Sequence, residues 1–278
     1  MTAPVAVVED AASVVDDIDA RPGSTASLLR TVVGLFLRPL GGWISAADLV
    51  TLAGDLDIAP ALARTGIARL KQKDLLLPER RDAVGYRLNP AALAMLQRGD
   101  RRIFAMRQMA DADTWCLVSF SIPETERAVR HQLRRRLQWI GAGAVSSALW
   151  ICPGHLQDEV PQIVDEVGAR AWVTLFPAGM PVTDRTPAEA AAAWWDLDGL
   201  ADEHRRFQES LTSLPAEPFA AYVHLIDRWR TLPYRDPGLP PSMLPAEWPG
   251  TRSFAEFEWL SGTLEAPAMA HVRRVTSR

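Results

Sequence analysis

A stretch that begins at Pro60 constrains the fold of this chain most, because its apolar residues recur with the period of an α-helix. When residues 60–72 are wound at 100° per residue, the apolar side occupies one arc of about 100°. That side holds Ala63, Gly66, Ile67 and Leu70. The opposite side holds Arg64, Thr65, Ala68, Arg69 and Gln72. We therefore expect an amphipathic helix with a basic outer face and a proline in its first turn, where a missing N–H costs little.

Directly after this helix the pattern changes to that of a β-hairpin. Residues 75–77 and 84–88 are short apolar runs typical of strands, and residues 78–83 form a charged turn between them. The turn carries Arg80 and Arg81, and Arg87 lies on the second run. A basic helix followed by a basic hairpin is the order of a recognition helix and its wing.

Two further helices are expected upstream. Ser24 or Thr25 can cap the first, and Pro39 and the glycines after it end it. Ser45 can cap the second. Three helices and a hairpin in this order predict a winged helix-turn-helix over residues 24–104, with its third helix in the major groove of DNA.

The charge distribution favours the same interpretation. The chain has a net charge of −4, but residues 24–104 hold 12 lysines and arginines against 7 aspartates and glutamates. Phosphates attract clustered cations whatever the average charge of a chain, so this basic module indicates contact with nucleic acid. A solvated helix face would also carry arginines, and it is the order of the elements that favours DNA. The predicted DNA contacts are Arg64, Thr65, Ala68, Arg69, Gln72, Arg80, Arg81 and Arg87.

The element order β-α-β-β-α-β predicts a ferredoxin-like split fold over residues 105–178. Its expected elements are a strand at 114–122, a helix at 124–139, a hairpin at 141–151, a helix at 155–167 and a strand at 171–176. The run Arg134–Arg136 is either a second nucleic-acid contact or, more commonly for such runs, a solvated helix face. The GAGA run at residues 141–144 follows a helix rather than a strand, so it is not a dinucleotide fingerprint.

A mostly helical domain is expected over residues 179–266, which makes the predicted fold class α+β. Its helices are expected at 188–214, 219–229 and 253–264, with a proline-rich crossing at 234–250. Residues 1–23 are expected to be a flexible acidic leader, and residues 267–278 a loose tail.

Motifs for catalysis and metal binding are absent from the sequence. The five histidines never pair at ligand spacing, and neither a Walker loop nor a GxSxG elbow occurs. Cys116 and Cys152 lie in apolar strand-like contexts typical of reduced buried thiols. Asp196 and Asp198 lie near an expected helix start, where capping explains them at least as well as a metal would. We therefore expect no enzyme activity, no cofactor and no metal.

Two enzymatic alternatives stay open: a small-molecule enzyme with an appended DNA-binding module, and a metal-dependent nuclease built on the middle domain. Against the nuclease, residues 115–123 carry no aspartate or glutamate where a ferredoxin-like nuclease needs an acidic ligand. The chain has no apolar run of about 20 residues and no basic, apolar start, so we expect no membrane span and a cytoplasmic location.

Together these features resemble the PaaX-like family, transcriptional repressors of phenylacetic acid degradation in bacteria. The resemblance runs from about Ser24 to Leu264 and rests on four segments. These are SLLRTVVGLFLRPLGG, ARTGIARLKQKDLLLPERRDAVGYRLNPAAL, WIGAGAVSSALWICP and WRTLPYRDPGLPPSMLPAEWPG. In one departure, the residue that ends the recognition helix, commonly Gly in the family, is Asp74 here.

The resemblance implies a homodimeric DNA-binding regulator and a middle domain similar to the Cas2-type ferredoxin-like fold. Two copies related by a dyad would read operator DNA as an inverted repeat. The resemblance also implies release from the operator by an aryl-CoA or acyl-CoA thioester such as phenylacetyl-CoA. A site for such an effector should combine cations with an aromatic or apolar pocket. The predicted ligand residues are Arg228, Trp229, Arg230, Tyr234, Arg235 and Trp248. The alternative is that these tryptophans belong to the core and the proline-rich segment crosses it as a rigid strap.

Overall fold

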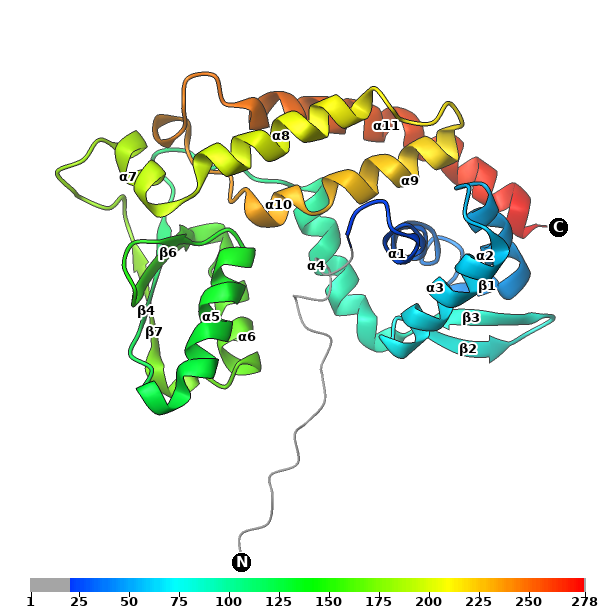
Figure 1. Ribbon diagram of the computed structural model, residues 1–278, viewed down its shortest axis with the longest axis horizontal. Helices are drawn as coiled ribbons and strands as arrows, with labels where there is room; N and C mark the ends of the chain where they lie inside the picture. The colour runs from blue at the N-terminus through cyan, green and yellow to red at the C-terminus, as the bar shows by residue number, and fades with distance from the viewer. Residues whose placement is uncertain (1–20, 278) are drawn as a thin grey trace, which may run out of the picture.

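The N-terminal module consists of three helices and a small antiparallel sheet (Figure 1). The computed structural model describes residues 21–277, so most of the predicted acidic leader lies outside the described residues. The elements are α1 (Thr25–Phe36), β1 (Trp43–Ser45), α2 (Ala46–Gly54), α3 (Pro60–Gln72), β2 (Leu76–Arg80) and β3 (Val84–Leu88). The sheet order is β1-β3-β2. These are the elements expected of a winged helix-turn-helix, with one addition.

The addition is β1, which pairs with β3 so that Ile44 lies opposite Tyr86. A strand of three residues is too short to show a period in the sequence. The predicted caps are both present: the Ser24 hydroxyl accepts a hydrogen bond from the Ser27 amide, and Ser45 does the same for Asp48. Each cap satisfies one of the amides that the first turn of a helix leaves without a partner.

The middle module has the predicted split β-α-β-β-α-β order. After α4 (Leu93–Phe104) come β4 (Trp115–Phe120), α5 (Arg127–Trp139), β5 (Gly143–Ala144), β6 (Leu149–Pro153), α6 (Glu159–Glu166) and β7 (Val173–Ala178). The sheet is antiparallel, with strand order β5-β6-β4-β7. Helices α5 and α6 cover one face of it (Figure 1). The ferredoxin-like prediction is therefore confirmed.

The helices after residue 186 differ from the predicted ones in two places. They are α7 (Pro187–Trp194), α8 (Leu197–Leu211), α9 (Pro218–Trp229), α10 (Leu232–Arg235) and α11 (Pro249–Thr276). The single helix expected at 188–214 is wrong, because Trp195 is extended and the chain restarts with Asp196 as the N-cap of α8. The Asp196 carboxylate accepts a hydrogen bond from the Gly199 amide, which confirms the capping interpretation of this residue.

The loose tail predicted after residue 266 is also wrong. Helix α11 continues through Pro267 to Thr276, and Ala268 and Val272 are completely buried. Proline usually ends a helix, because it lacks an N–H and its ring crowds the preceding turn. Here burial of the following two turns against the rest of the molecule outweighs that local cost.

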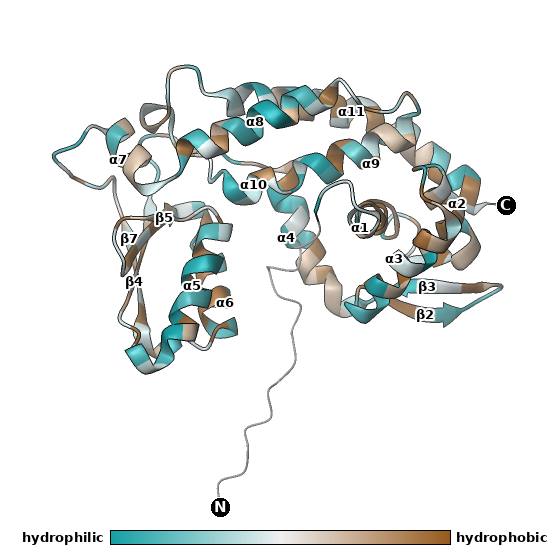
Figure 2. Ribbon diagram, viewed as in Figure 1, coloured by the Kyte–Doolittle hydropathy of each residue, from teal (hydrophilic) through white to brown (hydrophobic). Residues whose placement is uncertain are grey.

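One hydrophobic core joins the N-terminal module to the C-terminal helices. Its buried members include Leu29 and Phe36 of α1 together with Trp229 of α9 and Val272 of α11. Helix α1 is mostly brown in Figure 2 and packs against both α9 and α3. The two regions predicted as separate domains thus share a core, whereas the middle module has one of its own between its sheet and helices. None of the helices within residues 21–277 combines the length and apolarity that a membrane span needs.

Candidate nucleic-acid interface and ligand cavities

Helix α3 has the two faces that the sequence predicts. Ala63, Gly66, Ile67 and Leu70 are buried, and all five predicted contact residues of this helix are exposed. The close approach of α3 to α1 depends on Gly66. A Cβ built there would lie 2.5 Å from Leu29 Cδ1, closer than carbon atoms pack. The helix is therefore set tightly into the core while Arg64 and Arg69 face outward.

The end of α3 is fixed by a left-handed residue. Asp74 has φ of 52°, and the amides of Asp74 and Leu75 donate to the carbonyls of Lys71 and Leu70. This is the Schellman arrangement, which glycine favours because it has no Cβ to crowd the backbone. Asn89, which follows β3, donates to the Asp74 carbonyl at 2.7 Å. The turn therefore accepts Asp74 where glycine is common in the family, at the cost of backbone strain at this residue.

The wing arginines contact Glu79 and Trp43, two residues that the sequence pattern did not single out. Arg81 and Arg87 both pair with Glu79, at 2.6 and 3.2 Å, and the Arg81 guanidinium lies 5.3 Å from the centre of the Trp43 ring. Trp43 Nε1 in turn donates to the Glu79 carbonyl. Such exposed ion pairs contribute little to stability, so they orient the two arginines without preventing contact with phosphate. Arg80 is exposed beside them.

A buried carboxylate connects α1 to the C-terminal helices. Asp227 is completely buried and accepts hydrogen bonds from the Gly23 amide at 2.6 Å, from the Thr31 hydroxyl at 3.1 Å, and from the Ser27 hydroxyl. Arg230 pairs with the same carboxylate at 3.3 Å and donates to Ser27 at 2.8 Å. A buried charge with this many partners holds its neighbours in one arrangement. The network therefore sets the position of the helix against which α3 packs.

A second connection joins all three modules at Arg102 of α4. Its guanidinium makes two hydrogen bonds to Glu159 of α6, at 3.0 and 2.9 Å. It also donates to the carbonyls of Ile140 and Pro233, both at 3.3 Å, and lies 5.4 Å from the centre of the Tyr234 ring. The sequence carried no signal for this junction, because its partners lie between 38 and 131 residues away.

The six predicted ligand residues do not form one site. Trp229 is completely buried, donates to the Ile103 carbonyl at 3.1 Å and stacks on Phe257, so it is a core residue as the alternative interpretation held. Arg228 donates to the Ser210 carbonyl. The other four line three separate hollows: Trp248 one, Arg235 another, and Arg230 and Tyr234 a third.

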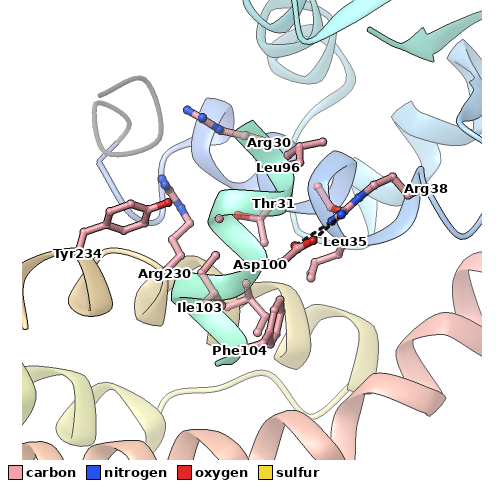
Figure 3. Close-up of a pocket in the computed structure, with 13 residues that line it drawn as sticks. Arg30, Thr31, Leu35, Arg38, Leu96, Asp100, Ile103, Phe104, Arg230 and Tyr234 are labelled. Carbon is pink, nitrogen blue, oxygen red and sulfur yellow. Dashed lines mark hydrogen bonds and ion pairs between the residues drawn. The ribbon is translucent and has the colours of Figure 1, made fainter. Parts of the chain in front are cut away.

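The third hollow, which we call the α1–α4 cavity, lies between the N-terminal module and the C-terminal helices. Figure 3 shows side chains of α1 and α4 on one side and Arg230 and Tyr234 on the other. Apolar residues such as Leu35 and Ile103 line it, and Arg38 is held by Asp100 through two hydrogen bonds of 2.5 and 2.9 Å. Its volume is about 60 Å³. The Asp227 network and the Arg102 junction share residues with its wall.

Within the described residues, no group of three or more histidine, cysteine, aspartate or glutamate side chains is placed to hold a metal ion. Cys116 and Cys152 lie opposite each other on β4 and β6 and are both buried free thiols, as predicted.

Comparison with known proteins gives matches along most of the chain. Residues 24–92 match the family model of the PaaX-like protein, residues 108–191 that of the PaaX protein central Cas2-like domain, and residues 195–274 that of the PaaX-like protein C-terminal domain. Among curated proteins, the transcriptional repressor PaaX of Escherichia coli (strain K12) is 26% identical over 251 residues. That match spans 84% of this chain and 78% of the repressor.

Among solved structures, the uncharacterized protein Rv0674 from Mycobacterium tuberculosis has a similar fold. Its TM-score is 0.63 at 24% sequence identity, and the match covers 91% of this chain and 100% of that one. At that identity the likeness supports the arrangement of the fold and nothing about ligands.

Proposed function

The chain belongs to the PaaX-like protein family, and from that premise we propose that it is a DNA-binding transcriptional repressor of aromatic-acid catabolism of the phenylacetate type. We assign it no catalytic role. One observation supports DNA binding most directly: α3 turns its exposed basic face outward next to a wing that carries three more arginines. As a regulator of transcription the chain would act in the cytoplasm, where bacterial DNA lies.

In the proposed complex α3 enters the major groove, and Arg64 or Arg69 contacts base edges there. The wing arginines contact phosphates of the adjacent backbone, which positions the module without reading sequence. One winged module buries only about 600–1,000 Å², too little for tight specific binding. We therefore propose a homodimer that reads inverted half-sites about one helical turn apart.

We further propose that an aryl-CoA thioester releases the repressor, with its acyl group in the α1–α4 cavity beside Arg230 and Tyr234. A cavity of about 150 Å³ takes benzene, whereas this one measures about 60 Å³. An aryl group would therefore have to push α1 and α4 away from α9 and α10. Because α1 supports α3, that movement would displace the recognition helix and lower the affinity for DNA.

Mobility-shift titration tests the DNA-binding assignment. The probe is a duplex enriched by the wild-type chain from a random library, and the variant carries Arg64→Ala and Arg69→Ala. Loss of a base contact should cost about 1–3 kcal/mol, which is roughly a 5- to 150-fold weaker Kd. The control carries Arg205→Ala and Arg206→Ala, which remove the same charge from exposed positions on α8. Equal affinity of both variants would show that α3 does not bind DNA.

The effector assignment has its own experiment. Phenylacetyl-CoA should weaken operator binding, whereas free phenylacetate and plain CoA should leave it unchanged. By thermodynamic linkage, operator DNA must weaken thioester binding by the same factor, which calorimetry can measure. If no aryl or acyl thioester changes operator affinity, release by thioesters is wrong while DNA binding stands.

A further inference from the structure

A hollow much larger than the α1–α4 cavity lies between the middle module and the C-terminal helices, and neither the DNA-binding face nor the α1–α4 cavity includes it. We call it the α5–α8 cleft. It has a volume of about 520 Å³, and its walls come from α5, β5, β6, α7, α8 and α10. Its lining includes three arginines and three tryptophans: Arg134, Arg135, Arg235, Trp150, Trp194 and Trp195.

Cations from segments far apart in the sequence converge on this cleft. Arg134 and Arg135 lie on α5, whereas Arg235 ends α10, one hundred residues later. Arg235 pairs with Glu203, but Arg134 and Arg135 take part in no ion pair within residues 21–277. Arg136, the third member of the run, pairs with Glu166 and does not line the cleft. Within the basic run, Arg136 thus forms an ion pair between helices, whereas Arg134 and Arg135 line the cleft.

Aromatic rings form the apolar side of the cleft. Trp194 ends α7 half-buried, with its ring centre 6.0 Å from that of Trp195. The Nε1 of Trp150 is a buried donor without a hydrogen-bond partner in the described chain. A buried donor of this kind is costly unless an acceptor reaches it. Rings beside guanidinium groups are the combination that binds a flat aromatic ligand carrying negative charge.

The GAGA run of residues 141–144 is built into this wall. Trp195 Nε1 donates to the Gly141 carbonyl at 2.8 Å. A Cβ on Gly143 would lie 2.5 Å from Trp195 Cε2, so only glycine lets the ring approach β5 this closely. Among the described residues that line the cleft, Asp196 is the only carboxylate, and it is engaged with the amide of Gly199 at the start of α8. The site is therefore rigid, aromatic and cationic.

We infer that the α5–α8 cleft binds a phosphate group attached to an aromatic ring system, that is, a nucleotide-type ligand. The arginines would bind the phosphate and the tryptophans the ring. Two sources supply this chemistry: a free nucleotide, or the 3′-phosphoadenosine end of a CoA thioester. The second source rests on the proposed function, in which case the cleft holds one end of the effector and the α1–α4 cavity the other. Tyr234 and Arg235, consecutive in sequence, line the two hollows.

Isothermal titration calorimetry on the full chain tests the inference, with 3′-phosphoadenosine 5′-phosphate, AMP, CoA and inorganic phosphate as probes. The variant carries Arg134→Ala and Arg135→Ala, and the matched control is again Arg205→Ala with Arg206→Ala. We expect nucleotide affinity to fall at least tenfold in the first and to change less than twofold in the second. Trp194→Leu should weaken the nucleotides but not inorganic phosphate. Melting curves establish that each variant is folded.

The probes also separate the two sources. Similar affinity for AMP and 3′-phosphoadenosine 5′-phosphate points to a free nucleotide, and a preference for CoA points to the effector. The inference is overturned if no probe binds at millimolar concentration, or if both double variants weaken binding equally. The CoA source alone is excluded if phenylacetyl-CoA releases Arg134→Ala/Arg135→Ala from DNA at the wild-type concentration, which leaves the proposed repressor standing. Nucleotide binding that never alters operator affinity supports the cleft and agrees with the proposed effector, because plain CoA is expected to leave operator binding unchanged.

Discussion

At the scale of single residues, Asp74 has a strained backbone conformation within a turn that is otherwise well hydrogen-bonded. Its left-handed backbone closes α3 and directs the chain into β2. A non-glycine residue in this region is strained by contact between its Cβ and the backbone. Asparagine and aspartate tolerate it better than other residues, which explains how an aspartate can stand where glycine is the common choice.

We predict that Asp74→Gly raises the free energy of unfolding by about 0.5–1 kcal/mol, because glycine adopts this backbone without strain. Asp74→Ala, which keeps a Cβ, should give no such gain. Urea denaturation of both variants at pH 7 measures the difference. A glycine variant no more stable than the wild type would contradict the strain argument.

The second residue-scale prediction concerns His155, which is half-buried after β6. Burial, with Arg102 and Arg107 adding to it, lowers the pKa of His155 to about 4. In the unfolded chain a histidine has a pKa near 6.5, so the unfolded state binds more protons between these two values. Stability is therefore present above about pH 6.5 and is lost as the pH falls toward 4.

His155→Gln should make that acid-induced loss smaller. Urea midpoints at pH 7 and pH 5 should differ less in the variant than in the wild type, because glutamine does not titrate. The carboxylates that also titrate in this range are common to both proteins and cancel in the comparison. An unchanged difference would show that His155 is not the group responsible.

At the scale of elements, α11 is the helix whose sequence and structure disagree most. Pro267 and the small residues around it suggest an end, yet the helix continues and returns to the N-terminal module. His271, near its end, hydrogen-bonds Asp55 at 2.8 Å and stacks on Phe219. The last turns of α11 thus hold α2 and α9 together.

Removal of residues 267–278 should lower the free energy of unfolding by about 2–4 kcal/mol, because it exposes the surface that Val272 and Ala268 bury. Removal of residues 277 and 278 alone is the control and should change little. Chemical denaturation of both truncated chains tests this. If the two truncated chains have equal free energies of unfolding, residues 267–276 add no stability, as expected of the loose tail that the sequence predicts.

At the scale of the whole molecule, the winged module cannot move independently of the C-terminal helices without disturbing their shared core. The Asp227 network fixes α1 to α9, and Arg102 fixes α4 to the middle module and to α10. A ligand that separates these elements can therefore act on α3 from a distance. This gives the proposed repressor a physical route from effector to DNA.

The dimer is the prediction that belongs to this scale. Light scattering at micromolar concentration should give twice the 30.6 kDa of one chain for the free protein, and the mass of two chains plus one duplex when DNA with inverted half-sites is added. The reason is area: a single winged module buries about 600–1,000 Å² on DNA, and tight specific binding needs more. A monomer under both conditions would rule out recognition of an inverted repeat by a dyad.

The sequence by itself determined the local elements of this protein. The core face of α3, the caps of α1 and α2 and the element order of the middle module follow from the spacing of apolar and capping residues within a few positions. Such patterns depend on neighbours along the chain, which is why they can be recognised without a structure.

Only the tertiary structure decided which side chains meet. Trp229 is a core residue, Arg134 and Arg235 share a cleft, and Arg102 joins three modules, because elements distant in sequence pack against each other there. The same packing overrides local signals: α11 continues past Pro267 since its final turns are buried, and the chain breaks at Trp195 since that ring is fixed against β5. Burial of large apolar surfaces outweighs the propensity of one residue, and no short window of sequence contains both partners of such a contact.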